Sequence, residues 1–172
     1  MKKKTLLFSL LAMFALVCAG GWYLLHQNQA QTVKAEARKT YIQSSRPTIF
    51  FHGWGSSSRA ERHMANAAKK AGVTQTIIEA KVAEDGTVTL KGTIPKDAVN
   101  PIVLVNFDNN RGASTQDQGN YAYAVVKALQ DTYGITEMNM VAHSYGNMAI
   151  VYYMLQHGSD TSLPKLIKQV DI

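Results

Sequence analysis

The sequence contains a single cysteine, Cys18, among its 172 residues. This excludes an intrachain disulfide, and it excludes a zinc site built from paired cysteines. Prolines number only four and the twelve glycines are no excess, so the composition argues against a wholly disordered chain. The length predicts one folded domain plus an appendage.

Acidic residues are scarce in the N-terminal part of the chain. Residues 1–40 carry six Lys and Arg residues but only one acidic residue, Glu36, while the whole chain has a formal net charge of +6. The remainder holds twelve basic and eleven acidic residues and is nearly neutral. No basic face for phosphates is expected there, so the sequence argues against a nucleic-acid partner. No second histidine or carboxylate stands at ligand spacing from His52, so neither a metal nor a cofactor is expected.

The N-terminus resembles an export signal. Three lysines precede an uncharged run of 21 residues, Thr5–Leu25, which as a helix would be ~32 Å long and could span a bilayer. We predict that residues 1–4 are cytoplasmic, 5–25 form a transmembrane signal anchor, and 26–45 form a polar tether or solvated helix. The protein would then be a single-pass protein of the cell membrane with residues 46–172 outside the cytoplasm. A cleaved signal peptide, and hence a secreted protein, is the alternative.

Strand and helix patterns alternate along residues 46–172. Short apolar runs predict buried strands, and Asp85-Gly86 predicts a tight turn between two further strands. Apolar residues at helical spacing predict three helices. In the first of them these residues are Ala60, Met64, Ala67, Ala68 and Ala71, and Ser56–Ser58 would offer capping hydroxyls. The predicted strands are Thr48–Phe51, Thr76–Val82, Thr87–Leu90, Pro101–Phe107 and Met138–Val141, and the predicted helices are Arg59–Ala71, Gln116–Tyr133 and Asn147–Gln156. This alternation predicts an α/β fold with a mostly parallel sheet and flanking helices.

The pentapeptide Ala142-His143-Ser144-Tyr145-Gly146 lies between a predicted strand and a predicted helix. A sharp turn at this point would present the Ser144 hydroxyl at the carboxyl edge of the sheet, as in a nucleophile elbow. Such a turn crowds the positions two before and two after the serine, and small residues, Ala142 and Gly146, stand there. The Tyr145 amide would point at a developing oxyanion, and His143 should point to the other side of the strand.

A second motif, His52-Gly53-Trp54-Gly55, directly follows the strand Thr48–Phe51. In folds that contain a nucleophile elbow, a loop of this kind carries the second donor of the oxyanion hole. Gly53 and Gly55 would let the backbone turn an N–H inward, and Trp54 is the predicted donor.

Three segments, FFHGWGSSSRAERHM, PIVLVNF and MNMVAHSYGNMA, together resemble the α/β-hydrolase superfamily. They are most similar to the membrane-anchored or secreted cell-surface, lipase-like hydrolases of Gram-positive bacteria. The resemblance implies that Ser144 is the nucleophile, that Trp54 and Tyr145 supply the oxyanion hole, and that His52 shapes its loop.

The chain departs from this pattern after the serine. In the α/β-hydrolase fold the catalytic acid and histidine follow the nucleophile in sequence, but only Asp160, Asp171 and His157 come after Ser144 as candidates. His157 would lie about 20 Å from Ser144 along its helix, too far to act as the base. We therefore expect no catalytic His and Asp in this chain, and we expect a hydrolase truncated after the nucleophile region, with its C-terminal strands missing and an unprotected sheet edge.

The expected activity is that of a serine hydrolase, esterase- or lipase-like, acting at the cell surface on an ester or acyl bond of a small molecule or lipid, with impaired turnover in this chain. Its oligomeric state is open. The alternative is a catalytically inactive, hydrolase-like surface domain that binds a partner.

Overall fold

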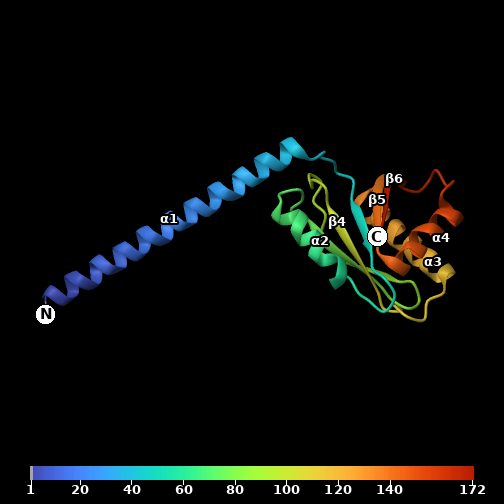
Figure 1. Ribbon diagram of the computed structural model, residues 1–172, viewed down its shortest axis with the longest axis horizontal. Coiled ribbons are helices and arrows are strands. Elements are labelled where there is room, and N and C mark those ends of the chain that lie inside the picture. The colour runs from blue at the N-terminus through green and yellow to red at the C-terminus, as the bar shows by residue number, and fades with distance from the viewer. Residues whose placement is uncertain (1) are drawn as a thin grey trace. The chain divides into compact units, whose positions relative to one another are not determined.

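A computed structural model describes the backbone of residues 2–172, and it describes the side chains from residue 13 onward except those of residues 34, 37 and 38. The chain divides into two compact units, Met1–Tyr41 and Ile42–Ile172 (Figure 1). The predicted hydrolase-like region of residues 46–172 lies within the second unit.

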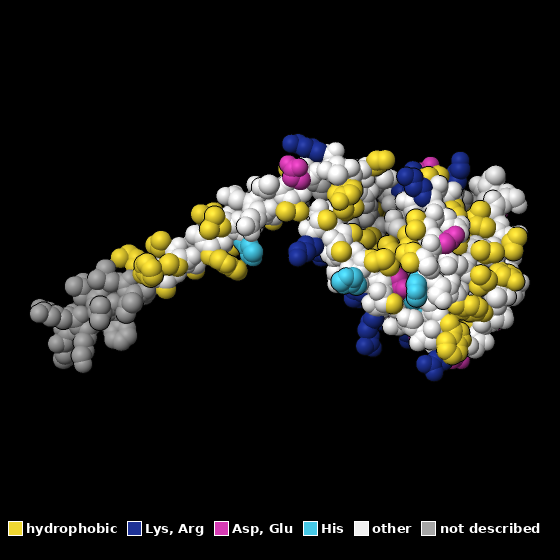
Figure 2. All heavy atoms as spheres, viewed as in Figure 1, with side chains coloured by type: hydrophobic (Ala, Val, Ile, Leu, Met, Phe, Trp, Pro, Cys, Tyr) yellow, Lys and Arg dark blue, Asp and Glu magenta, His cyan; other side chains and the backbone are white. Residues whose placement is uncertain are grey.

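The first unit contains one helix, α1 (Lys2–Thr40). Between Met13 and Leu25 its large apolar side chains are exposed (Figure 2). Among the residues that could be searched, no helix has an apolar stretch long enough to cross a bilayer. This finding does not support the anchor predicted over residues 5–25, and the side chains of residues 5–12 lie outside the described part. The predicted tether is helical as far as Thr40.

The second unit is built on a six-stranded sheet with the order β3-β2-β4-β1-β5-β6. All neighbouring strands run parallel except β3, which pairs antiparallel with β2 across the turn at Asp85-Gly86 and places Val88 opposite Val82. The strands are β1 (Thr48–Phe51), β2 (Ile77–Val82), β3 (Val88–Lys91), β4 (Ile102–Phe107), β5 (Glu137–Ala142) and β6 (Lys165–Asp171). The prediction of an α/β fold with a mostly parallel sheet is confirmed.

Helices cover both faces of this sheet. The helices α3 (Thr115–Tyr133) and α4 (Asn147–His157) lie on one face and α2 (Arg59–Lys70) lies on the other (Figure 1). Strand β1 alternates between the two layers: Ile49 and Phe51 pack toward α3 and α4, whereas Phe50 packs toward α2. Strand β4 is likewise buried on both faces, as its unbroken apolar run predicts.

Helix α3 has well-defined ends. The Ser114 hydroxyl accepts from the Asp117 amide, and the Asp117 carboxylate accepts from the Ser114 amide, which completes a capping box. Gly134 ends the helix in the left-handed conformation with φ 66°. The helix predicted over Gln116–Tyr133 is therefore present and one residue longer.

Helix α2 forms as predicted, but only part of its predicted apolar pattern faces the core. Glu61 and Ala65 are buried and Ala68 packs on the core, whereas Ala60, Met64, Ala67 and Ala71 are exposed. Of the predicted capping hydroxyls, that of Ser57 accepts from the Arg59 amide at 3.5 Å, and Ser58 makes no side-chain cap.

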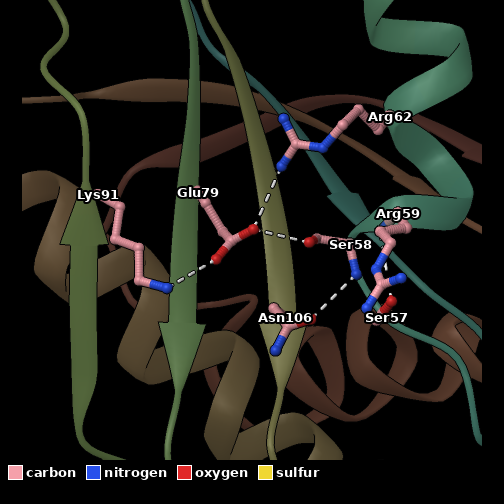
Figure 3. Close-up of polar contacts among 7 residues, drawn as sticks. All are labelled: Ser57, Ser58, Arg59, Arg62, Glu79, Lys91 and Asn106. Carbon is pink, nitrogen blue, oxygen red and sulfur yellow. Dashed lines mark hydrogen bonds and ion pairs between the residues drawn. The ribbon is translucent and has the colours of Figure 1, made fainter.

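The Ser58 hydroxyl, instead of capping α2, takes part in a polar cluster beside the sheet (Figure 3). It donates to Glu79 of β2 at 2.7 Å, and the Ser58 amide donates to Asn106 of β4 at 3.1 Å. Arg62 and Lys91 each approach the Glu79 carboxylate at 3.2 Å. Burial alone would raise the pKa of Glu79, but the bonds from Ser58 and Lys91 and the two cationic charges hold it below its ordinary value. The cluster fixes the start of α2 on the sheet.

The last strand of the chain, β6, pairs in parallel with β5 and places Asp171 beside Ala142. Most of its side chains are exposed, and it lies at one edge of the sheet while β3 lies at the other.

Candidate active site

The turn between β5 and α4 holds Ser144 in a strained backbone conformation. Its φ of 52° lies in the left-handed region, which residues other than glycine rarely adopt. Ser144 is exposed and opens a short 3₁₀ turn, η1 (Ser144–Gly146), directly after β5. Three hydrogen bonds hold this turn: the His143 amide donates to the Phe51 carbonyl at 3.1 Å, the Ser144 amide to the Ile172 carbonyl at 2.8 Å, and the Gly146 amide to the His143 carbonyl at 3.0 Å. Strain of this kind persists where the surroundings over-determine it, and it concentrates at functional sites.

The positions two residues on either side of Ser144 are tightly packed. A Cβ atom at Gly146 would lie 2.6 Å from the His52 carbonyl oxygen and 2.7 Å from that of Phe51, so only glycine fits there. Ala142 is fully buried at the end of β5, where its methyl group is accommodated. The requirement for small residues at these two positions follows from the close approach of β1.

The loop after β1 is fixed through His52, whose side chain is only 2 % exposed. The Phe107 amide donates to its Nε2 at 3.1 Å, so Nδ1 carries the proton and donates to the Gly53 carbonyl at 2.9 Å. Burial lowers the pKa of His52, and the bond to Gly53 offsets only part of that effect. The imidazole is therefore neutral and ties the loop to the end of β4. This matches a loop-shaping residue and does not suit a general base facing the serine.

Gly53 brings this loop directly against the turn at Ser144. A Cβ atom at Gly53 would lie 3.3 Å from the Ser144 Cβ and 3.2 Å from His143 Nδ1. Across residues 13–172, no hydrogen bond is found from the backbone amides of Trp54 or Tyr145 to another group of the chain. The structure thus brings the two motifs side by side and leaves both amides free to donate. His143 is exposed and its ring approaches Gly53.

A third segment, the loop between β4 and α3, joins both motifs. The Gly55 amide donates to the Asn110 carbonyl at 2.7 Å, and the Asn110 side chain returns a bond to the Ser56 carbonyl at 2.7 Å. At its far end the Ala113 carbonyl accepts from the Tyr145 hydroxyl at 3.4 Å. Gly55 itself has φ 67°, a conformation that favours glycine. This loop therefore ties the segment that follows β1 to the turn at Ser144.

The candidate acids and base downstream of Ser144 do not assemble around it. His157 lies at the other end of α4 and stacks on Tyr123, with ring centroids 4.3 Å apart. The Asp160 carboxylate accepts hydrogen bonds from the hydroxyl and the amide of Ser162, and these bonds lower its pKa. Asp171 lies beside the turn at the end of β6, where its carboxylate accepts from Gln169 at 2.9 Å. In the described part of the chain, no histidine is hydrogen-bonded to the Ser144 hydroxyl.

Sequence reasoning missed Glu61, a buried carboxyl group close to the turn. Only 2 % of Glu61 is exposed, and its Oε2 has no hydrogen-bond partner among the described residues. Burial raises its pKa, and its own backbone amide and the charge of His143 counteract this only in part. Glu61 and Ala65 are four residues apart on one face of α2, a spacing that could have revealed the inward carboxylate.

Two hollows lie away from Ser144, at the amino ends of the strands. One of about 600 Å³ is lined by residues 44–46, 93–96, 98 and 132–137, and the other of about 420 Å³ lies between the end of α4 and the start of β6. Neither hollow includes Ser144, Trp54 or Tyr145. In open α/β sheets ligands bind at the carboxyl ends of the strands, so the edge that carries Ser144 remains the better candidate.

A mostly parallel sheet between helices, with a strained serine at a strand-to-helix turn, defines the architecture of an α/β hydrolase. The profile of the family described as alpha/beta hydrolase of unknown function (DUF915) matches residues 35–172, and the chain belongs to this family. Comparison with curated protein sequences gives no match.

Two solved structures are similar to this chain. The product of gene lin2722 from Listeria innocua is 28% identical, with a TM-score of 0.69, over 75% of this chain and 51% of that one. A protein named as a candidate cell surface hydrolase from Lactobacillus plantarum WCFS1 is 23% identical and shares the fold, with a TM-score of 0.61, over 74% of this chain and 52% of its own. The chain thus spans about half the length of the structures that it matches.

Proposed function

We propose that this protein is a serine hydrolase that cleaves an ester or related acyl bond of a small molecule or lipid. The observation that carries the proposal is the strained, exposed Ser144 with the Gly53 loop packed against it. Family membership supports hydrolysis in general. The choice of serine chemistry is supported by the backbone conformation at residue 144, which serves no evident purpose in a plain turn.

In the proposed reaction the Ser144 Oγ attacks the carbonyl carbon of the substrate, and the resulting oxyanion accepts hydrogen bonds from the Trp54 and Tyr145 amides. Loss of one such donor typically costs about 3 kcal/mol of transition-state stabilisation. The hydroxyl proton passes to a histidine and from there to the leaving group, and an acid orients that histidine. We propose that the histidine–acid pair comes from outside residues 1–172, because within the described residues no histidine is hydrogen-bonded to the Ser144 hydroxyl and no acid is bonded to the neighbouring His143.

We further propose that the reaction takes place at the cell surface. Three lysines followed by an apolar run are typical of an export signal, and that pattern opens this chain. The Lactobacillus plantarum protein, which shares the fold, is named for the cell surface.

A fluorophosphonate probe tests the nucleophile. We expect it to label the chain at Ser144 when a histidine-bearing downstream segment of a longer family member is supplied, as read by intact mass and peptide mapping. Ser144→Ala should abolish the labelling, whereas Ser159→Ala, which removes an exposed serine beyond α4, should leave it unchanged. Failure to label Ser144 in cooperatively folded protein supplied with that histidine-bearing segment would contradict the proposal.

The same experiment separates a second candidate, a catalytically inactive binding domain of the hydrolase fold. The observation that favours it is the lack of a histidine bonded to Ser144 within the described residues. Folded protein that is not labelled, even when a histidine-bearing downstream segment of a longer family member is added, would support this alternative.

A further inference from the structure

We propose that Arg111 binds an anionic group of the substrate, so that the preferred substrate is an ester carrying a carboxylate or phosphate close to the scissile carbonyl. This inference deepens the proposed function and rests on it for the position of the carbonyl. The anion site itself rests on separate observations at Trp54 and Arg111.

The Arg111 guanidinium lies directly on the loop that carries Trp54. Its central carbon is 5.4 Å from the centre of the Trp54 ring, within the range of a cation–π contact. Its Nε would lie 3.2 Å from a Cβ built at Gly55, so glycine at that position leaves room for the side chain. The Trp54 indole N–H also donates to the Arg111 carbonyl at 3.1 Å. The two residues are therefore held together by backbone and side-chain contacts.

The positive charge of Arg111 is not neutralised by the protein. Every ion pair found within the described residues uses another cation, and Asp108, three positions away, pairs with Lys81 at 3.0 Å. Arg111 is exposed, so its outward N–H groups can reach a ligand. A guanidinium stacked on an indole face keeps its planar fork oriented, and that fork matches a carboxylate or phosphate with two parallel hydrogen bonds.

The location of this charge decides what it would recognise. The amide of Trp54, proposed to hold the oxyanion, and the ring of Trp54, which supports Arg111, belong to one residue. The loop that carries Arg111 also reaches Tyr145, the second proposed donor, through the Ala113 carbonyl. A carbonyl held by these amides would therefore lie beside the loop that positions the guanidinium, and we place the anionic substituent of the substrate toward Arg111.

An arginine that merely stabilises the loop by stacking is the competing explanation, and anion titration distinguishes the two. The chain has two tryptophans, Trp22 and Trp54, so Trp22→Phe leaves Trp54 as the only indole reporter. Hexanoate, hexyl phosphate and neutral hexanol would be titrated while the Trp54 emission is followed. We expect a saturable change with one or both anions and none with hexanol, and the two anions distinguish a carboxylate from a phosphate.

Variants of Arg111 then assign the site. Arg111→Gln should weaken anion binding at least tenfold, and Arg111→Lys, which keeps the charge but loses the fork, should give intermediate affinity. Arg59→Gln removes another exposed arginine, at the start of α2, and should bind as the parent does. Equal binding by Arg111→Gln, or by hexanol, would overturn the inference, with circular dichroism confirming that each variant is folded.

A second measurement links the anion to the serine. The mono-p-nitrophenyl ester of glutaric acid and p-nitrophenyl pentanoate have acyl chains of equal length that end in a carboxylate and a methyl group. Each would acylate Ser144 by forming an Oγ–acyl bond, with p-nitrophenolate leaving and the hydroxyl proton passing to solvent, and intact mass follows the product. We expect the glutaryl ester to react about tenfold faster, and we expect Arg111→Gln to bring this ratio toward one.

The outcomes separate the two proposals. Acylation of Ser144 at equal rates by both esters would overturn the role of Arg111 and leave the serine hydrolase standing. Arg111-dependent anion binding without any acylation of Ser144 would contradict the proposed function and retain the anion site.

Discussion

Ser144 has a left-handed backbone conformation that is strained for serine and for alanine but not for glycine. For an L-residue the left-handed region costs roughly 1–2 kcal/mol, whereas glycine enters it freely. We therefore expect Ser144→Gly to unfold at higher urea concentration than Ser144→Ala, with a difference in the free energy of unfolding on the order of 1 kcal/mol. Both variants lose the hydroxyl, so each is the other's control. Equal stability would mean that the turn relaxes in solution and stores no strain.

His52 predicts how stability depends on pH. Because burial lowers its pKa in the folded state, the unfolded chain binds a proton between about pH 6.5 and the lowered value while the folded chain does not. The free energy of unfolding should therefore fall as the pH falls through this range, by at most about 1.4 kcal/mol per pH unit. Urea unfolding at pH 7.5, 6.5 and 5.5 measures this slope.

Replacement of His52 by Gln should flatten that slope, whereas replacement of the exposed His63 should not. Glu61 acts in the opposite direction at lower pH, because its raised pKa means that the folded state takes up a proton first and gains stability as the pH falls. Its contribution is common to the parent and both variants, so the comparison isolates His52. An unchanged slope in His52→Gln would contradict the neutral, buried imidazole.

The sequence reveals a functional residue most readily when its contacts are close along the chain. Ser144, Gly146 and His52 belong to short motifs whose demands are local, so their placement beside the strand ends was predictable. The contact of Arg111 with Trp54 joins residues that are 57 positions apart, and no periodicity encodes such a pairing. Glu61 was missed because a glutamate on a helix is ordinarily assigned to solvent.

At the scale of elements, the close approach of α3 and α4 depends on Gly119. A Cβ atom there would lie 2.7 Å from the Tyr152 Cβ and 3.0 Å from its backbone carbon. Gly119→Ala should push the helices apart and destabilise the protein by roughly 1–3 kcal/mol, despite the better helix propensity of alanine. Asn120→Ala, on the exposed face of the same helix, should change stability by less than about 0.5 kcal/mol. Thermal or urea unfolding measures both changes in stability. A Gly119→Ala variant that is more stable than the parent would contradict this packing.

Elements were predicted well where their apolar pattern was unbroken, as in β4, and less well where a polar residue faces inward. The pattern of α2 was only partly informative because alanines lie on both sides of that helix, so Ala68 packs on the core whereas Ala60 and Ala67 are exposed. Ser58 was expected to offer a cap to α2 because capping is a local preference, but its backbone is helical (φ −51°, ψ −15°) and not extended as in a typical N-cap, and its hydroxyl donates to Glu79 instead.

At the scale of the whole molecule, the order of the strands was beyond the reach of the sequence. Alternating strands and helices predict a parallel sheet, but they do not state that β1 lies between β4 and β5. That order places β1 and β4 at the centre, buried on both faces, and β3 and β6 at the edges. Stability should follow this arrangement, because local opening is cheapest where few apolar contacts must break.

Hydrogen exchange read by mass spectrometry tests this gradient. Peptides covering β1 and β4 should exchange slowest, and those covering β3 and β6 should exchange orders of magnitude faster. The matched comparison is β4 with β6, which are of similar length and both pair in parallel. Equal protection of these two strands would show that β6 is covered in solution.

The hydrogen bond from the Ser144 amide to the carbonyl of Ile172, the residue after β6, couples the turn at Ser144 to an edge strand of the sheet. Proteolytic removal of this strand, or a force that separates it from β5, would release the turn without touching any of the side chains around it. The strained backbone conformation of Ser144 therefore depends on the pairing of β6 at the edge of the sheet.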